Sequence, residues 1–194
     1  MESVGQAMLI RTLDCSFALL GLIVGSPILL IVLILGIFDT GSPLFFQVRV
    51  GRDLKPFTLV KFRTMQLGTA SVATHMADAA VVTSLGRFLR KTKLDELPQL
   101  WNVLKGDMSL VGPRPGLFNQ TDLLRERALA GVLAVRPGIT GLAQINGVDM
   151  SDPVRLARMD SEMIRGMTLR AYLRYILLTI IGRGRGDRIK SKVG

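Results

Sequence analysis

The longest apolar stretch of the chain lies near its N-terminus, where residues 17–38 read FALLGLIVGSPILLIVLILGIF and contain no charge. A helix rises about 1.5 Å per residue, so a stretch of this length is long enough to cross a bilayer. A cleaved signal sequence is disfavoured, because the preceding residues carry mixed charges and no clear small-residue cleavage site follows. The pattern predicts a retained membrane segment over residues 1–38 and a second domain over residues 39–194.

A Ser-Pro pair, Ser26-Pro27, lies near the middle of this stretch. Proline removes a backbone hydrogen bond and kinks a helix, and a neighbouring serine can satisfy the freed carbonyl group. Two interpretations follow: a spanning helix that is merely bent, or a helix, a break and a second helix that enter and leave the membrane by the same face. Charge favours the second, because Lys and Arg are frequent after residue 38 whereas the residues before Phe17 offer only Arg11.

The remaining pattern predicts a mainly α-helical fold with one small β-hairpin. Residues 44–63 alternate apolar and polar positions around a polar turn at 51–56, which predicts two strands with a basic face formed by Arg49, Lys61 and Arg63. Apolar spacing and proline positions predict helices and rigid turns, namely helices at 84–91, 97–105, 119–133 and 153–181 and turns at 111–116 and 136–141.

The end of the last predicted helix, residues 169–181, carries an apolar stripe beside arginines. It is too short to span a bilayer. The same stripe suits an amphipathic helix lying on the membrane surface or a helix packed into the domain core. The sequence therefore predicts a compact α-rich domain with interfacial amphipathic helices, attached to the N-terminal membrane segment.

Composition narrows the choice of partners. Hydrophobic residues make up 48% of the chain, yet its net charge is +10 and its pI about 10.6. An apolar and strongly basic protein suits anionic lipid, nucleotide phosphates or nucleic acid. Nucleic acid is the weakest of these, because only 6% of the residues are aromatic and no reader motif is present. Cys15 and His75 are each the only residue of their type, so a metal would need oxygen ligands, as Mg²⁺ does.

The strongest candidate for chemistry is the pair Asp95-Glu96. Pro98 lacks an N–H and is tolerated in the first turn of a helix but not in its interior, so the pair falls at the start of the helix predicted at 97–105. Backbone N–H groups and the helix dipole favour an anion there. Taken alone, the pair indicates either ordinary helix capping or a site for phosphate chemistry. Several cations precede it: Arg87, Arg90, Lys91 and Lys93.

Four segments, taken in order, resemble one known family. They are KFRTM at residues 61–65, LDELPQLWNVLKGDMS at 94–109, LVGPRP at 110–115 and RPGITGLAQING at 136–147. Together they resemble the bacterial sugar transferase family, the monotopic polyprenyl-phosphate phosphoglycosyl transferases, in its minimal single-domain form. The likeness extends over nearly the whole chain, including the apolar segment with its Ser-Pro pair. Against this background, catalysis is the favoured interpretation of Asp95-Glu96.

The resemblance implies an enzyme that moves a phospho-sugar from a UDP-sugar onto polyprenyl (undecaprenyl) phosphate and releases UMP. It implies the first membrane step of bacterial glycan assembly, such as that of O-antigen, capsule or glycoprotein glycan. The catalytic domain would lie on the cytoplasmic face of the bacterial inner membrane, against the lipids of the inner leaflet.

The resemblance also implies particular residues. A covalent phospho-sugar intermediate would form on Asp95, and the membrane helix would be re-entrant, with its break at Ser26-Pro27. Asp95 and Glu96 are the implied catalytic residues and metal ligands for Mg²⁺. Glu96 would either hold the metal or help to activate the lipid phosphate.

Phosphoryl chemistry needs cations, because a carboxylate and a diphosphate repel each other. Arg90 and Arg114 are our first candidates for binding phosphate oxygens, since arginine matches phosphate with two parallel hydrogen bonds. Lys61 and Arg63 on the predicted hairpin come second. The remaining residues expected at the substrate site are Pro113, Pro115 and Gln144.

Two positions depart from the family pattern. Val148 stands where many relatives have arginine, and the segment from Asp160 to Ile164, which contains Met163, replaces an aromatic-rich one. Both lie away from the acidic pair in the sequence. They leave the identity of the sugar open rather than the reaction.

A second class of function is a catalytically silent, membrane-anchored scaffold that recruits glycan-assembly enzymes. The joint presence of Asp95, Glu96, Arg90 and Arg114 disfavours it, because a scaffold needs none of them together. A membrane-tethered nucleic-acid binder is disfavoured by the absence of a reader motif. A homodimer is compatible with the sequence.

Overall fold

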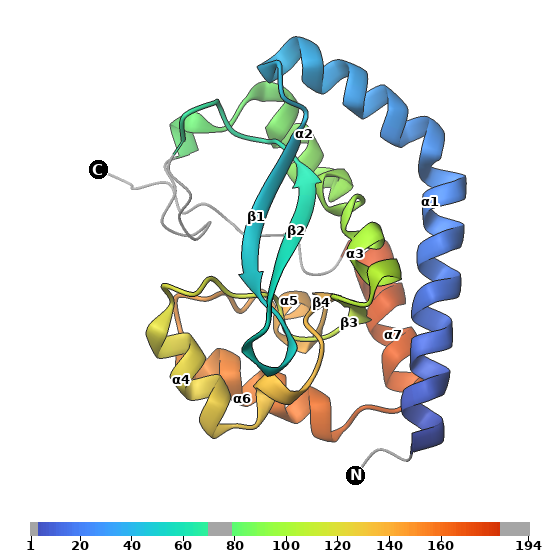
Figure 1. Ribbon diagram of the computed structural model, residues 1–194, viewed down its shortest axis with the longest axis vertical. Helices are drawn as coiled ribbons and strands as arrows, with labels where there is room; N and C mark the ends of the chain where they lie inside the picture. The colour runs from blue at the N-terminus through green and yellow to red at the C-terminus, as the bar shows by residue number, and fades with distance from the viewer. Residues whose placement is uncertain (1–3, 70–78, 183–194) are drawn as a thin grey trace.

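The computed structural model of the chain describes residues 4–69 and 79–182, so His75 lies outside them. The described chain is mainly helical with a small antiparallel hairpin, as predicted (Figure 1). Its elements in chain order are α1 (Val4–Thr40), β1 (Leu44–Val50), β2 (Pro56–Phe62), α2 (Ser84–Thr92), α3 (Gln99–Lys105), β3 (Ser109–Val111), α4 (Thr121–Leu129), β4 (Gly138–Thr140), α5 (Leu142–Ile145), α6 (Pro153–Arg165) and α7 (Leu169–Ile180).

The N-terminal apolar segment forms one helix, α1, which bends before it leads into β1 (Figure 1). Pro27 lies inside this helix and cannot donate a hydrogen bond to the carbonyl of Ile23. The Ser26 hydroxyl donates to that carbonyl instead, at 2.8 Å, as predicted for a neighbouring serine. We expected two helices separated by a break. The structure instead has a single continuous helix with a bend, because the Ser26 hydroxyl replaces the backbone hydrogen bond that Pro27 cannot make.

One face of α1 is apolar and exposed. Among the described residues α1 is the helix long and apolar enough to cross a membrane, and only 11% of its most apolar window is buried. Exposed apolar surface of this extent marks a lipid contact or another interface. The composition and exposure of α1 therefore suggest that the protein associates with a membrane. Its exposed large apolar side chains include Leu19, Leu20, Ile23, Val24, Leu30, Ile31, Ile34 and Phe38.

The opposite face of α1 belongs to the hydrophobic core. Ala18 is fully buried in the main core cluster, together with side chains of β2, α3, β3, α6 and α7. Further along the helix, Val32 packs with Phe62 of β2 and Leu89 of α2 in a second cluster. The same helix thus carries the apolar surface and part of the core, and the expected domain boundary at residue 38 falls in its last turn.

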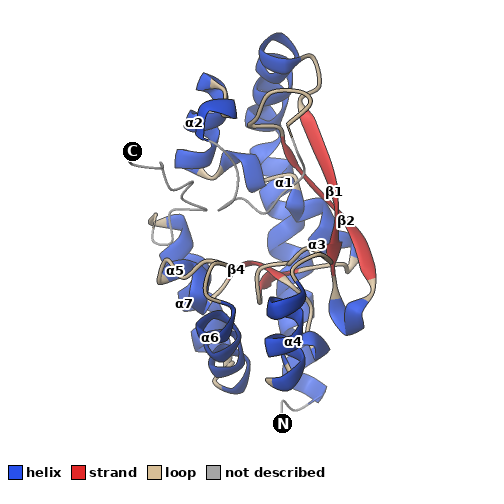
Figure 2. Ribbon diagram, turned by 90° about the vertical axis from the view of Figure 1, so that its left-hand side faces the viewer, coloured by secondary structure: helices blue, strands red, loops and turns tan. Residues whose placement is uncertain are grey.

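The predicted hairpin is confirmed: β1 and β2 pair antiparallel, from Leu44 opposite Phe62 to Val50 opposite Pro56. Figure 2 shows it along one side of the molecule, with α4 near its lower end and α2 and α6 on the opposite side. The hairpin face that carries Arg49 and Lys61 also carries apolar side chains. Phe57 and Leu59 on that face are buried in the main core.

Other boundaries differ from the predictions. The turn predicted at 136–141 contains a short strand, β4, which pairs in parallel with β3, the strand that ends where the turn predicted at 111–116 begins. The helix predicted at 153–181 is two helices, because the Thr168 hydroxyl accepts the N–H of Ala171 and starts α7 there. On α7, Tyr172 is buried in the core while Leu173 and Leu177 are exposed. The apolar stripe of α7 therefore serves the core on one side and is open on the other.

Candidate active site

Asp95 and Glu96 lie in one turn of 3-10 helix, Leu94–Glu96, between α2 and α3. Pro98 immediately precedes α3, in the position that its missing N–H predicts. Lys93 joins α2 to the turn with a left-handed backbone, φ 60°, which costs an L-residue about 1–2 kcal/mol. Strain of this kind concentrates at functional sites. Local geometry, rather than a regular helix start, therefore places the acidic pair.

Asp95 is buried, with 7% of its surface exposed. Burial and then the neighbouring Glu96 carboxylate raise the pKa of Asp95 to about 6, while the positive charges of Lys61, Arg90 and Arg114 oppose the rise. Those cations belong to β2, α2 and the loop after β3. The fold therefore assembles three of the four predicted cations around the carboxylate.

Arg114 holds Glu96 directly, with 2.9 Å between Nη2 and Oε1 in a partly buried ion pair. Arg90 is positioned by Thr64, a buried residue of the KFRTM segment, whose hydroxyl accepts a hydrogen bond from Nε at 2.9 Å. Thr64 was not among the site residues predicted from the sequence, although the KFRTM motif contains it. Its position shows that part of this motif orients a cation at the acidic pair.

Arg63 takes a different position from the one we expected. Its guanidinium donates to the carbonyls of Ser42, at 2.8 Å, and Leu44, at 3.2 Å. It therefore ties the end of β2 to the segment that follows α1. Arg63 and Lys61 both lie 5.4 Å from the ring centroid of Phe45. Of the two hairpin cations, Lys61 is the one whose charge acts on Asp95.

The loop that carries Arg114 is fixed through its backbone. The carbonyl of Pro113 accepts the N–H of Gly138 at 2.8 Å, and that of Gly116 accepts the N–H of Val50 at 3.0 Å. A Cβ on Gly138 would lie 2.0 Å from the nitrogen of Gly112, so only glycine permits this approach. The two predicted rigid turns therefore pack backbone against backbone, and Pro113 acts here through its carbonyl.

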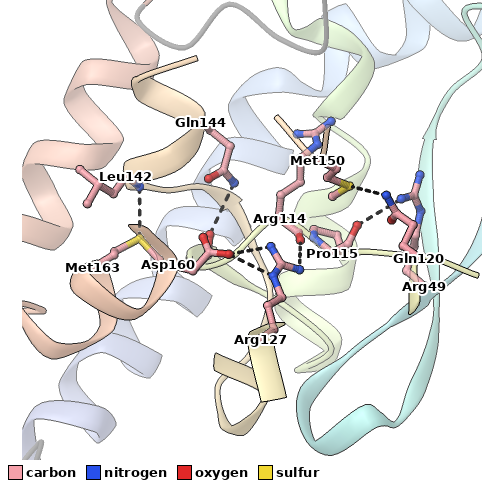
Figure 3. Close-up of polar contacts among 11 residues, drawn as sticks. Arg49, Arg114, Pro115, Gln120, Arg127, Leu142, Gln144, Met150, Asp160 and Met163 are labelled. Atoms are coloured by element: carbon pink, nitrogen blue, oxygen red, sulfur yellow. Dashed lines mark hydrogen bonds and ion pairs between the residues drawn. The ribbon is translucent and has the colours of Figure 1, made fainter. Parts of the chain in front are cut away.

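Two buried arginines hold the remaining carbonyls of this loop (Figure 3). Arg127 of α4 donates to the carbonyl of Arg114 at 2.8 Å, and Arg49 of β1 donates to that of Pro115 at 3.1 Å. Asp160 of α6 accepts the Nε and Nη2 hydrogens of Arg127 at 3.0 and 2.7 Å. Arg127 thus holds the backbone of Arg114, whose side chain bonds to Glu96, and Arg49 holds the backbone of Pro115.

The Arg127–Asp160 pair is almost completely removed from water, with 3% and 0% of the two residues exposed. Burial raises the pKa of Asp160, and the guanidinium opposes that rise. Sequence reasoning missed both residues as part of the site, because single charges in amphipathic helices normally mark the solvated face. No signal in one sequence links α4 to α6.

The remaining positions considered in the sequence are Gln144 and the two departures from the family pattern, Met163 and Val148. Gln144 reaches the carbonyl of Gly112 at 3.5 Å, and its buried Oε1 has no hydrogen-bond partner among the described residues. Met163, one of the two departures, accepts the N–H of Leu142 at 3.2 Å through its sulfur (Figure 3). Val148, the other, packs at the edge of a third apolar cluster. Met163 thus contacts the start of α5, and Val148 packs against side chains of α4, α5 and α6.

The acidic pair is also the place where a metal would fit. Within residues 4–69 and 79–182 no three His, Cys, Asp or Glu side chains are grouped closely enough to hold a metal ion. Two adjacent carboxylates suit Mg²⁺, which is usually bound by one or two carboxylates together with waters and substrate phosphates. Asp95 and Glu96 therefore fit a metal that arrives with a phosphate-bearing substrate.

Comparison with known proteins identifies the family of the chain. The family model of the bacterial sugar transferases matches residues 5–184, and the chain belongs to this family. It is 49% identical over 138 residues to an uncharacterized sugar transferase, EpsL, of Bacillus subtilis, covering 71% of this chain and 68% of that one. It is 36% identical over 189 residues to the exopolysaccharide production protein ExoY of Sinorhizobium fredii, with coverages of 88% and 83%.

A longer relative carries a specific name. The chain is 39% identical over 181 residues to a UDP-glucose:undecaprenyl-phosphate glucose-1-phosphate transferase of Klebsiella pneumoniae. The match covers 88% of this chain but only 39% of that protein. Relatives of this kind therefore contain a large part to which this chain does not correspond.

The buried pair gives a prediction about stability. Asp160→Ala leaves the Arg127 guanidinium buried without its partner, and we expect a loss of about 3 kcal/mol in the free energy of unfolding. Glu162→Ala is the matched control on the same helix, because its ion pair with Arg158 is exposed and should contribute no more than about 0.5 kcal/mol. Chemical denaturation measures both. Equal losses would show that the buried pair contributes no more to stability than the exposed one.

Proposed function

We propose that this protein transfers a phospho-sugar from a UDP-sugar to undecaprenyl phosphate and releases UMP. The observation that carries the proposal is the buried Asp95 carboxylate beside Glu96, within the field of Lys61, Arg90 and Arg114. A binding module gains nothing from the cost of burying two adjacent carboxylates. The names of the Klebsiella relative and of an undecaprenyl-phosphate galactose phosphotransferase of Salmonella typhimurium support the same reaction.

The proposed reaction has two displacements at one phosphorus atom. A carboxylate oxygen of Asp95 attacks the phosphorus that bears the sugar, a new O–P bond forms, and the bond to UMP breaks. An oxygen of undecaprenyl phosphate then attacks the same phosphorus, the bond to Asp95 breaks, and the free carboxylate returns. Two steps suit substrates of which one is soluble and the other lies in lipid, because they need not bind together.

The surroundings of Asp95 match the role of a nucleophile. A pKa of about 6 leaves the carboxylate ionised at neutral pH, although burial has removed much of its water. The cations offset the repulsion between this carboxylate and the diphosphate as they meet. Arg114 has a planar fork suited to phosphate oxygens, and its present partner Glu96 holds it in place beside Asp95.

Mg²⁺ is the proposed cofactor. Asp95 and Glu96 would hold it, and when bound it would neutralise negative charge on the diphosphate. Glu96 is the better candidate for a lasting ligand, because Asp95 is needed as the nucleophile. Activation of the lipid phosphate is the second role proposed for Glu96.

We further propose that α1 is re-entrant, with both ends on the cytoplasmic face of the bacterial inner membrane. The support is the bend associated with Pro27, the exposed apolar face of α1, and the close packing of its first half against the rest of the protein. A helix whose first half is part of the main core cannot place that half on the far side of a bilayer. The exposed face of α7 is proposed to rest on the same leaflet.

The first prediction concerns the nucleophile. Asp95→Asn preserves the shape of the side chain but removes its nucleophilicity, so UMP release in a steady-state assay should fall at least about 10³-fold. Wild-type turnover should also decline as the pH falls through about 6, where Asp95 becomes protonated. Asp122→Asn, on the exposed start of α4, is the control and should leave turnover unchanged. More than a tenth of the wild-type rate in Asp95→Asn would refute the mechanism.

The same substitution should stabilise the protein. Because the pKa of Asp95 is raised from 3.8 to about 6 on folding, the folded state binds its proton more tightly. Stability is then lost as the pH rises from about 4 through 6, by about 3 kcal/mol above that range. Asp95→Asn should therefore raise the free energy of unfolding by most of this amount above pH 6, and should change it little below pH 4. Denaturation at several pH values measures it.

The third prediction of this section concerns topology. In a Cys15→Ser background, single cysteines at Gly5 and Lys55 should both be protected from an impermeant maleimide in intact cells and react after lysis. Replacing Ser26 and Pro27 by alanine should favour a straight spanning helix and expose the Gly5 site to the outside. Opposite accessibility of the two sites in the otherwise unchanged protein would contradict the re-entrant arrangement.

A further inference from the structure

A cavity of about 270 Å³ is lined by the first turns of α1, by β3 and the two residues after it, by the turn before β4, and by the junction of α6 and α7. Neither Asp95 and Glu96 nor the three cations around them line it. Three arginines from separate parts of the chain do: Arg11, Arg52 and Arg136. The proposed reaction uses none of them.

Two of these arginines are fixed in position. Arg11 donates to the carbonyls of Leu104, at 3.3 Å, and Met108, at 3.4 Å. Arg136 donates from Nε to the carbonyl of Gly106 at 2.9 Å. All three carbonyls belong to the C-terminal end of α3 or the turn after it, where cations are favourable. Carbonyls orient these guanidinium groups without cancelling their charge.

The third arginine comes from the tip of the hairpin. Asp53 and Leu54 adopt left-handed conformations, φ 55° and 60°, which closes the tight turn from Arg52 to Lys55. The tip lies against the turn Val132–Ala134, so the hairpin brings Arg52 to the edge of the cavity. Arg52 also forms an ion pair with Asp53 at 3.3 Å, but this pair is exposed and exposed ion pairs are weak.

The inner wall of the cavity is polar but saturated. Asp14 accepts hydrogen bonds from the N–H of Leu110 at 2.8 Å, the hydroxyl of Ser109 at 3.0 Å and that of Tyr172 at 2.9 Å, all on one oxygen. Burial raises the pKa of Tyr172, so its hydroxyl stays protonated and continues to donate. One carboxylate satisfied by three donors opposes three arginines, which leaves the lining positive.

The rest of the lining is apolar, and it adjoins the apolar surface of the protein. Ile10, Ile164 and Met167 line the cavity. Met8 and Leu9, the neighbours of Ile10 on α1, are exposed at 67% and 45%. The cavity therefore combines a cationic edge with apolar walls, next to the face of α1 that we assign to lipid.

We propose that this cavity binds the phosphate headgroup of an anionic phospholipid, with the three arginines on the phosphate and the apolar walls on the start of the acyl chains. Arginine forks match phosphate oxygens, and a diester attached to hydrocarbon also uses the apolar walls, which a nucleotide or a free phosphate leaves unused. Such a lipid would join α1, the hairpin tip and α6 at one point.

Thermal unfolding of the full chain in a neutral detergent tests the proposal. Increasing short-chain phosphatidylglycerol should raise Tm to a saturable plateau, which gives an apparent Kd. Phosphatidylcholine of the same chain length should leave Tm unchanged, and any rise with inorganic phosphate or UMP should be the same in Arg52→Ala as in the wild type, because these ligands bind at the acidic pair. An equal rise with phosphatidylcholine would overturn the charge requirement, and a rise with phosphate or UMP that Arg52→Ala removes would overturn the assignment to lipid.

Variants separate the cavity from general surface charge. Arg52→Ala should weaken the apparent affinity for phosphatidylglycerol at least about fivefold, whereas Lys55→Ala removes one charge from the same turn without touching the cavity and should not. Ala7→Phe keeps every charge but fills the space, and should abolish the plateau. Lipid-free Tm values near wild type confirm folding. Equal weakening by Lys55→Ala, or normal binding by Ala7→Phe, would overturn the proposal.

Discussion

Two adjacent carboxylates repel each other, and burial makes the negative charge of Asp95 more costly still, so the cations around the pair are needed to offset both effects. Arg114 bonds to Glu96 at 2.9 Å, and Lys61, Arg90 and Arg114 all oppose the raised pKa of Asp95. These cations lie on a strand, a helix and a loop that are distant in the sequence. The rest of the fold can be understood as the framework that keeps their positive charges within reach of one buried carboxylate.

That framework extends far beyond the acidic pair. The backbone of Arg114 is held by Arg127, which is held in turn by Asp160, so α4 and α6 contribute to the site without contacting it. The apolar helix α1 is built in as well, because Asp14 bonds to β3, the strand that leads into the loop of Arg114. The apolar helix α1 and the loop that carries Arg114 are therefore parts of one packed structure.

The sequence predicted those features that depend on neighbours along the chain. Alternation predicted the hairpin, Pro98 placed the acidic pair ahead of α3, and Ser26 satisfies the carbonyl that Pro27 frees. It did not predict the short β3–β4 pairing, the Thr64 bond to Arg90, or the Arg127–Asp160 pair. Each of these joins segments that are far apart in sequence, and a charged residue buried by a distant partner has the same local pattern as one on a solvated face.

The central claim is that Asp95 carries the phospho-sugar between the two substrates. The most direct measurement incubates the protein with Mg²⁺ and each of a panel of UDP-sugars, omits the lipid acceptor, and examines the peptide containing Asp95 by mass spectrometry. The account predicts a phospho-sugar adduct on Asp95 with release of UMP, lost in the presence of EDTA and in Asp95→Asn. Release of UMP only when undecaprenyl phosphate is present, with no adduct on the peptide, would contradict it and favour direct attack by the lipid phosphate.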